Sequence, residues 1–142
     1  MSYVDGFVIP VSRDKIDAYK ALARKAGEIF REHGALAVVE CIGDDVPYGK
    51  LTSFPRAVQA GDDEVVIFSW AVYPSRAARD AANAKIMADP RLQGEMPFDG
   101  RRMIFGGFEA WLGHVIRGHV KVDGIGWRCM LRGCSEIADW LA

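Results

Sequence analysis

Long nonpolar runs are missing from this chain of 142 residues. No stretch reaches about 18 nonpolar residues, whereas a membrane-spanning helix needs about 20. The N-terminal sequence also lacks a basic segment ahead of its nonpolar residues, so we expect no secretion signal. Cysteine is scarce: Cys41, Cys129 and Cys134 cannot all pair within one chain, and free thiols are typical of a reducing compartment. We therefore expect a cytoplasmic protein that does not cross a membrane.

An excess of charge of either sign is also missing. Lys and Arg number 18 against 19 Asp and Glu, which gives a formal net charge of -1. Such a chain has no overall field that attracts a phosphate backbone. The aromatic strand motif on which RNA-recognition domains stack bases is absent as well. We expect no DNA partner, and these absences argue against RNA.

Several sequence motifs of enzymes are missing too. The patterns GxGxxG, GxxxxGK[ST], HExxH and GxSxG do not occur, which removes the usual support for nucleotide-dependent, metalloprotease and esterase functions. His114 and His119 are five residues apart, as are Cys129 and Cys134. That spacing places two side chains on opposite faces of a strand and far apart around a helix, so neither pair forms a chelate. We expect no metal and no cofactor.

The chain does have regular hydrophobic patterns. Half of its residues are nonpolar, as in one globular domain. Some segments are short and rich in Val, Ile and aromatic residues, as in strands. In others a nonpolar residue recurs every three or four positions, as in helices. These patterns predict strands at 3–11, 35–42, 64–73 and 102–111 and helices from 12 to 34 and from 75 to 89. Gly34 is expected to end the first helix, and Ser75 to cap the start of the second. The order βαββαβ indicates an α+β, ferredoxin-like fold, in which two helices cover one face of a four-stranded antiparallel sheet. The connection between the second and third strands has about twenty residues, which is unusually long. Such a connection either has a function or contains further secondary structure.

The third and fourth predicted strands are nonpolar on both faces. Phe68 and Trp70 alternate with Ile67 and Ala71, and Ile104 alternates with Phe105. A sheet face open to water normally carries polar residues. Because two helices cover only one face, we expect a homodimer through the open sheet face.

Residues 113–142 differ in character from the rest and form a C-terminal extension to a domain at 1–112. The extension carries two of the three cysteines and two of the four tryptophans. A fifth strand at 115–122 and a short helix at 135–141 are one interpretation. The alternative is that the extension is unrelated sequence, and the two stay open.

Three segments carry a resemblance to a known family: VVECIGDDVPYGK (38–50), FSWAVYPSRAARDAANAKIMADPR (68–91) and MPFDGRRMIFGGFEAW (96–111). Together with the opening YVDGF, they resemble the YbaA-like proteins, a bacterial family of unknown function in the dimeric α/β-barrel superfamily. The resemblance covers residues 1 to about 112. It implies a ferredoxin-like subunit and a homodimer whose two sheets face each other as a barrel, and it implies no reaction.

Candidate ligand-binding residues come from the second helix and from a turn-rich loop. Arg79 and Asn83 are one helical turn apart, and an Arg beside an amide can hold a carboxylate or an enolate. We expect them to face a pocket, with Asp99 and Tyr73 near its rim. The alternative is a solvated helix face with ordinary ion pairs and turn-forming residues.

Asp5, Glu40 and Glu109 interrupt otherwise nonpolar strands. A carboxylate that faces a barrel interior can have a raised pKa and act as a general base. The structural alternatives are a position at the edge of the sheet or pairing with an arginine such as Arg102, since buried acids are usually paired.

The sequence therefore favours a small dimeric protein that binds a small organic ligand between sheet, helices and loops. Whether it is an enzyme stays open. A cofactor-independent monooxygenase or isomerase of an aromatic or enolic metabolite is the first alternative, and a structural or RNA-associated module is the second.

Overall fold

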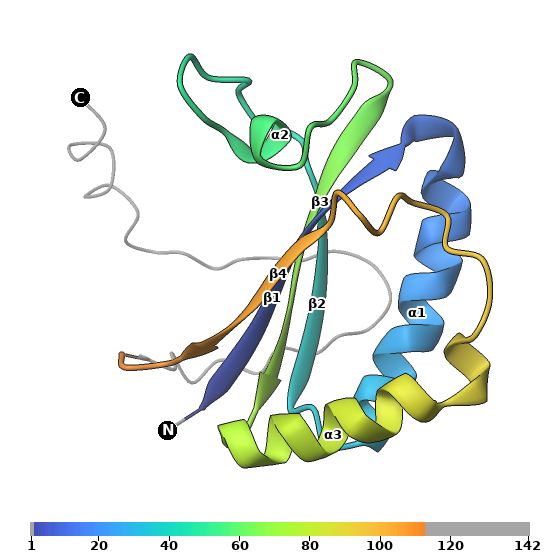
Figure 1. Ribbon diagram of the computed structural model, residues 1–142, viewed down its shortest axis with the longest axis vertical. Coiled ribbons are helices and arrows are strands. Elements are labelled where there is room, and N and C mark those ends of the chain that lie inside the picture. Colours follow the sequence, from blue (N-terminus) through green and yellow to red (C-terminus); the bar gives the residue numbers. More distant parts are fainter. Residues whose placement is uncertain (1, 113–142) are drawn as a thin grey trace, which may run out of the picture.

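The computed structural model describes residues 2–112, and the strand and helix predicted within 113–142 lie outside the described residues. Two long helices and four strands alternate along the chain (Figure 1). Their bounds are β1 (Tyr3–Ser12), α1 (Ile16–Glu32), β2 (Ala37–Ile42), α2 (Phe54–Ala57), β3 (Glu64–Tyr73), α3 (Arg76–Ala88) and β4 (Ile104–Glu109), with short 3-10 turns η1 (Arg13–Lys15) and η2 (Pro90–Leu92).

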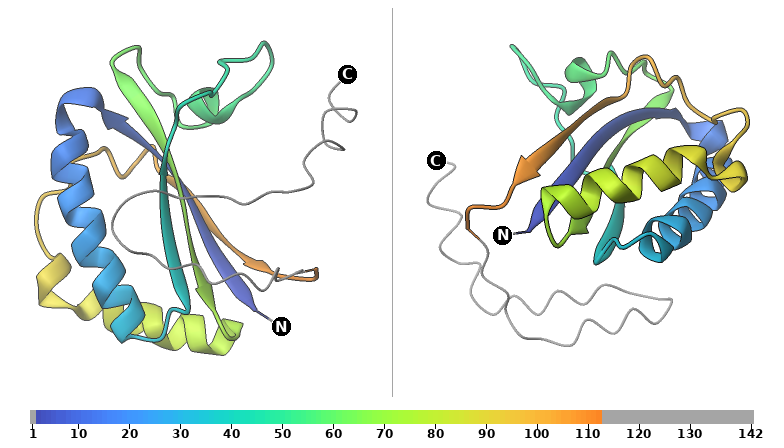
Figure 2. Two further views of the ribbon diagram at one scale, coloured as in Figure 1. Left: turned by 180° about the vertical axis from the view of Figure 1, so that it is seen from behind. Right: turned by 60° about the horizontal axis from the view of Figure 1, so that its bottom comes forward.

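The four strands form one antiparallel sheet in the order β2-β3-β1-β4. This is the ferredoxin-like arrangement, so the predicted α+β fold is confirmed. Both long helices lie on the same face of the sheet, and α3 crosses near the C-terminal end of α1 (Figure 2). Two local signals act as expected: the Ser75 hydroxyl caps α3 by accepting from the Ala78 amide at 3.1 Å, and Gly34 follows α1 at a φ of +108°.

The long connection before β3 contains α2. Ser53 caps this short helix by accepting a hydrogen bond from the Arg56 amide at 3.2 Å, and Pro55 stands in its first turn. The helix packs on the face of the sheet opposite α1 and α3, where Val58 joins a small buried cluster with Val8 and Val66. Folded structure therefore accounts for part of this unusually long loop.

The rest of that second face is uncovered within residues 2–112. Phe68 is 43% exposed and Phe108 is 62% exposed. Phe68 also packs against Phe54 and Trp70, with ring centroids 5.7 and 5.4 Å apart. We refer to the uncovered side, which carries Phe68, Trp70, Ile104 and Phe108, as the open face.

The core on the helix side of the sheet is divided into two clusters. One lies under the start of α1 and contains Tyr19 with Ile9, Val11 and Ile67. The other lies between the end of α1 and α3 and comprises Ile29, Ala35, Ala71, Tyr73, Ala82 and Ile86. The space between these two clusters is the candidate site.

Among the described residues, no helix combines the length and the hydrophobicity that crossing a membrane requires.

Candidate functional site

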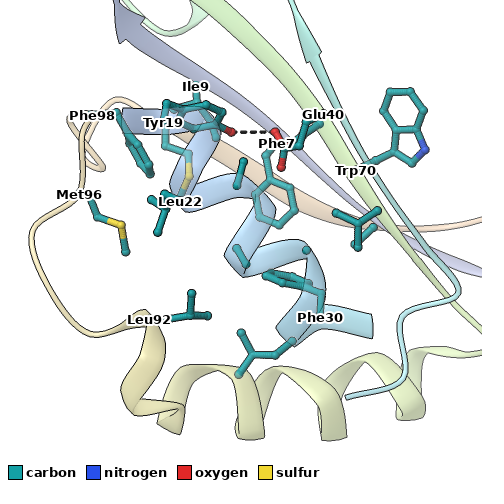
Figure 3. A pocket seen from close by; sticks show the side chains of 18 of the residues that line it. Phe7, Ile9, Tyr19, Leu22, Phe30, Glu40, Trp70, Leu92, Met96 and Phe98 are labelled. Carbon is teal, nitrogen blue, oxygen red and sulfur yellow. Dashed lines mark hydrogen bonds between the residues drawn. The ribbon is translucent and has the colours of Figure 1, made fainter. Parts of the chain in front are cut away.

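A cavity of about 400 Å³ lies between the sheet, α1, α3 and the chain from Gln93 to Met103 (Figure 3). Its walls are mainly nonpolar, and they include residues of both core clusters as well as three methionines. The residues that define its walls are Phe7, Ile9, Tyr19, Leu22, Phe30, Glu40, Ser69, Ile86, Met87, Leu92, Met96, Phe98 and Met103. Protein interiors are close-packed, with few voids larger than a water molecule. A nonpolar cavity of this size falls in the range of ligand-binding pockets.

Glu40 and Tyr19 form the polar feature of this cavity. The Tyr19 hydroxyl donates to Oε2 of Glu40 at 2.8 Å, and the bond joins α1 to strand β2 (Figure 3). Tyr19 is buried and its ring packs edge-on against Phe98, whereas Glu40 stands on an edge strand and is exposed to water on one side. Glu40 therefore links the nonpolar cavity to the solvent.

The surroundings perturb the acidity of both groups. Partial removal of water from the Glu40 carboxyl raises its pKa, while the hydroxyls of Tyr19 and Ser69 act in the opposite direction by stabilising the carboxylate. Burial is also the main cause that raises the pKa of Tyr19, and the neighbouring Glu40 charge adds to it. The pair consequently consists of a phenol that keeps its proton and a carboxylate that is less acidic than usual.

Charged side chains lie on the outer side of Glu40. A shallow groove beside the cavity shares Tyr19 and Glu40 with it and is also lined by Lys20, Arg24, Glu28 and Arg31. The walls of the cavity itself contain no Lys, Arg or His from the described part of the chain. Among residues 2–112, the Glu40 carboxylate is thus the one charged group that the interior offers.

Arg79 and Asn83, the two candidates from the second helix, are brought together on Asp5 of β1. The Arg79 guanidinium donates from Nη1 to Oδ1 of Asp5 at 2.6 Å, and Asn83 donates from Nδ2 to Oδ2 at 3.3 Å. Arg79 also donates to the Tyr3 hydroxyl at 3.2 Å and lies over the Tyr3 ring, 4.6 Å from its centroid. These contacts fix α3 to the sheet, and neither residue lines the cavity.

Tyr73 belongs to the same end of the sheet, but it lies in the core and not at a rim. Its side chain is fully buried, and its hydroxyl has no hydrogen-bond partner among residues 2–112. Burial raises the pKa of Tyr73 to about 12, and the negative charge of Asp5 contributes. The prediction of a rim position for this residue was therefore wrong.

Asp99 lies at the opposite end of the sheet from the other three candidates. It accepts hydrogen bonds from the side chains of Arg101 and Arg102, at 3.1 and 3.2 Å. Arg102 in turn forms a bidentate pair with Glu64, with both distances 2.7 Å. Glu64 pairs with Ser12 at one end of β1, whereas Tyr73 pairs with Tyr3 at the other. The four candidates do not border one pocket, and their role in ligand binding stays a prediction.

The three strand carboxylates do not lie on the open face of the sheet. Asp5 and Glu40 point to the helix side, Asp5 paired with Arg79 and Glu40 with Tyr19, while Glu109 is exposed on β4. Arg102 pairs with Glu64 and Asp99 and not with any of the three.

The Tyr19–Glu40 pair is the feature that reasoning from the sequence missed. The sequence indicated Glu40 as a general base or as the partner of an arginine, and it did not single out Tyr19. The signal was present in strand parity: Glu40 shares a face with Val38, which packs on the helix-side core. Among residues 2–112, no three His, Cys, Asp or Glu side chains are grouped to hold a metal.

Fold and cavity together define a small α+β protein of ferredoxin-like topology with a nonpolar chamber between sheet and helices. Residues 2–100 match the family described as a protein of unknown function, DUF1428, and the chain belongs to that family. It is 58% identical over 113 residues to the uncharacterized protein YbaA of Escherichia coli K12. The aligned region covers 78% of this chain and 97% of YbaA. YbaA of Shigella flexneri matches with the same identity and coverage.

The resemblance to YbaA-like proteins is thereby confirmed. Among solved structures, that of Rv0793 from Mycobacterium tuberculosis superposes on this chain with a TM-score of 0.50 and 14% sequence identity. The superposed region covers 81% of this chain and 100% of Rv0793. An identity this low supports the fold alone.

Proposed function

We propose that this protein binds a small, largely nonpolar organic molecule in the cavity between the sheet, α1 and α3. The observation that carries the proposal is the division of the helix-side core: a space of about 400 Å³ separates two buried clusters and has nonpolar walls. An unfilled core of this kind costs stability, because the side chains around it lose packing contacts. A bound molecule would restore those contacts.

The composition of the walls fits such an occupant. Phe7, Phe30 and Phe98 offer aromatic surfaces, and Met96 and Met103 offer flexible, polarisable ones. Methionine side chains adapt to ligands of different shape. The proposed ligand is therefore recognised chiefly through its nonpolar body.

The test is titration with the fluorescent hydrophobic probe N-phenyl-1-naphthylamine, before and after the cavity is filled. Ala26→Phe places a ring in the cavity and is expected to weaken probe binding at least tenfold. Met96→Trp also places a ring in the cavity, from an exposed loop position. It keeps the test possible if Ala26→Phe fails to fold. Native mass spectrometry of freshly purified protein would also report a retained ligand.

Ala81→Phe provides the matched control, because Ala81 is an exposed residue of α3 outside the cavity. This variant is expected to bind the probe as the wild type does. Equal probe affinity in the wild type and in both filled variants, with far-UV circular dichroism unchanged, would refute the proposed site.

We also propose that two copies associate through the open face. In support, Phe68, Ile104 and Phe108 leave nonpolar surface exposed on a sheet, and contiguous patches of this kind usually mark interfaces. Two copies would cover this surface by placing sheet against sheet.

Sedimentation at micromolar concentration tests the association. Phe108→Asp is expected to give a folded monomer, since Phe108 is already 62% exposed. Met87→Asp, at a residue that is 77% exposed on α3, is expected to leave the dimer intact. A monomeric wild type would contradict the proposal.

A further inference from the structure

We infer that the cavity selects molecules with a hydrogen-bond-donating head group, a protonated amine above all, and rejects carboxylates, because Glu40 is the polar anchor at its solvent side. The inference rests on the proposed function and deepens it by naming a ligand class.

The first step is the acceptor capacity of the site. A carboxylate has about four lone-pair positions. The Tyr19 hydroxyl occupies one of them at 2.8 Å, and the Ser69 hydroxyl also acts on the carboxylate. Tyr19 also fixes the Glu40 side chain against α1, so the carboxylate is held in place before a ligand arrives. The remaining positions suit a donor, and a charged donor forms the stronger bond.

The second step is the absence of a competing anchor. Cavity walls within residues 2–112 contain no cationic side chain. Arg79, which the sequence suggested as a carboxylate anchor, is already bound to Asp5 at 2.6 Å and lies outside the cavity. A ligand carboxylate would meet a like charge in a nonpolar space, which is unfavourable.

The third step is orientation. Glu40 is exposed on the edge strand, whereas Leu22, Phe30 and Ile86 line the interior. A ligand with one polar end and a nonpolar body would thus place its head group beside Glu40 and its body between the two core clusters. The aromatic ring of Tyr19, next to the carboxylate, adds a favourable surface for a cation.

The charged groups around Glu40 come from α1, and β2 adds a thiol. Lys20, Arg24, Glu28 and Arg31 line the outer groove, and Cys41 follows Glu40 on β2. Tyr19 faces it from α1 and Ser69 from β3. Burial is the largest influence on the pKa of Glu40 and raises it, whereas the hydroxyls of Tyr19 and Ser69 lower it. Amine selection is therefore expected to weaken as the pH falls and the carboxylate takes up a proton.

The experiment compares four probes with one shared ring system: 1-naphthylmethylamine, 1-naphthylmethanol, 1-naphthoate and 1-methylnaphthalene. At pH 7 the wild type is expected to bind the amine at least tenfold more tightly than the alcohol, and the naphthoate most weakly. In Glu40→Gln the advantage of the amine over the alcohol is expected to fall about tenfold, with 1-methylnaphthalene unaffected. Glu28→Gln removes the same charge from the outer groove and is expected to keep the wild-type order.

The outcomes separate the two proposals. Equal affinity for all four probes in the wild type would overturn the selection by Glu40 and leave the cavity as a ligand site. Binding of none of them, or binding that Ala26→Phe does not reduce, would overturn both. If Glu40→Gln fails to fold, the four probes are compared in the wild type at pH 7 and pH 4. Selection by the Glu40 carboxylate requires that the preference for the amine is lost at pH 4, and a preference that persists there would overturn it.

Discussion

The ion pair between Arg79 and Asp5 allows a quantitative test of how α3 is held to the sheet. The side chains are 16% and 6% exposed, and the Nη1–Oδ1 distance is 2.6 Å. Arg79→Met would leave the Asp5 carboxylate buried without its cation. Removal of one partner of a buried pair costs about 3 to 5 kcal/mol. We expect about 3 kcal/mol at pH 7, because Asn83 still donates to Asp5.

The reverse change is expected to cost less. Asp5→Asn leaves Arg79, which keeps Asp80 as a partner at 2.8 Å and can turn toward water, so we expect about 1 to 2 kcal/mol. In the double variant no buried charge is left unpaired. It should therefore be more stable than Arg79→Met alone, with a coupling energy of about 2 kcal/mol between the two positions.

Urea unfolding of the four proteins at pH 7 measures this cycle, and the loss in Arg79→Met corresponds to a fall in Tm of about 10 °C. Arg76→Met is the control. Its pair with Asp80 is 3.8 Å long and its side chains are 74% and 57% exposed, so the change should stay within about 0.5 kcal/mol. A loss below about 1 kcal/mol in Arg79→Met, or simple additivity in the double variant, would refute this account.

Three further predictions concern other parts of the molecule. Tyr73→Phe removes a buried hydroxyl without a partner in residues 2–112, so urea unfolding should show unchanged stability or a gain of up to about 1 kcal/mol; a clear loss would reveal a missed partner. Glu40→Gln removes a carboxyl whose pKa is raised by folding. That carboxyl favours the folded state below its unfolded pKa, and the benefit is lost as the pH rises through the folded pKa. The stability of Glu40→Gln relative to wild type should thus increase from pH 4 to pH 7, and a flat difference would contradict the shift. A chain that ends at Leu112 should retain its far-UV circular dichroism and most of its thermal stability, and loss of cooperative unfolding would show that the extension is required.

Local patterns were sufficient to predict most of the fold. Strand β3 was predicted with the bounds that it has, and the Ser75 cap and Gly34 mark helix ends as expected. The start of β2 and both ends of β4 were each predicted two residues too far, since ladder pairing and not composition decides where a strand stops. Helix α2 was not identified because four residues are too short to show a period.

The candidate site depended on contacts that no local pattern contains. Arg79 and Asn83 were recognised as neighbours, but their shared partner Asp5 lies 74 residues before Arg79. Helix α3 buries Ala82, whereas Ala81 and Ala84 are exposed, and Arg79 points inward because Asp5 compensates its charge. The ion pair thus places a charged side chain on the inward face, which hydrophobicity alone would not predict.

The division of the helix-side core links ligand binding to the mechanics of the fold. The two clusters touch the same cavity from different sides, so a molecule inside it would contact both at once. Without it, α3 and the segment that follows are expected to open more readily than the sheet, and their amide hydrogens to exchange faster. Occupancy would couple the two halves into one cooperative unit, with a gain in stability that grows with the logarithm of ligand concentration. The ligand would then serve as the missing part of the hydrophobic core.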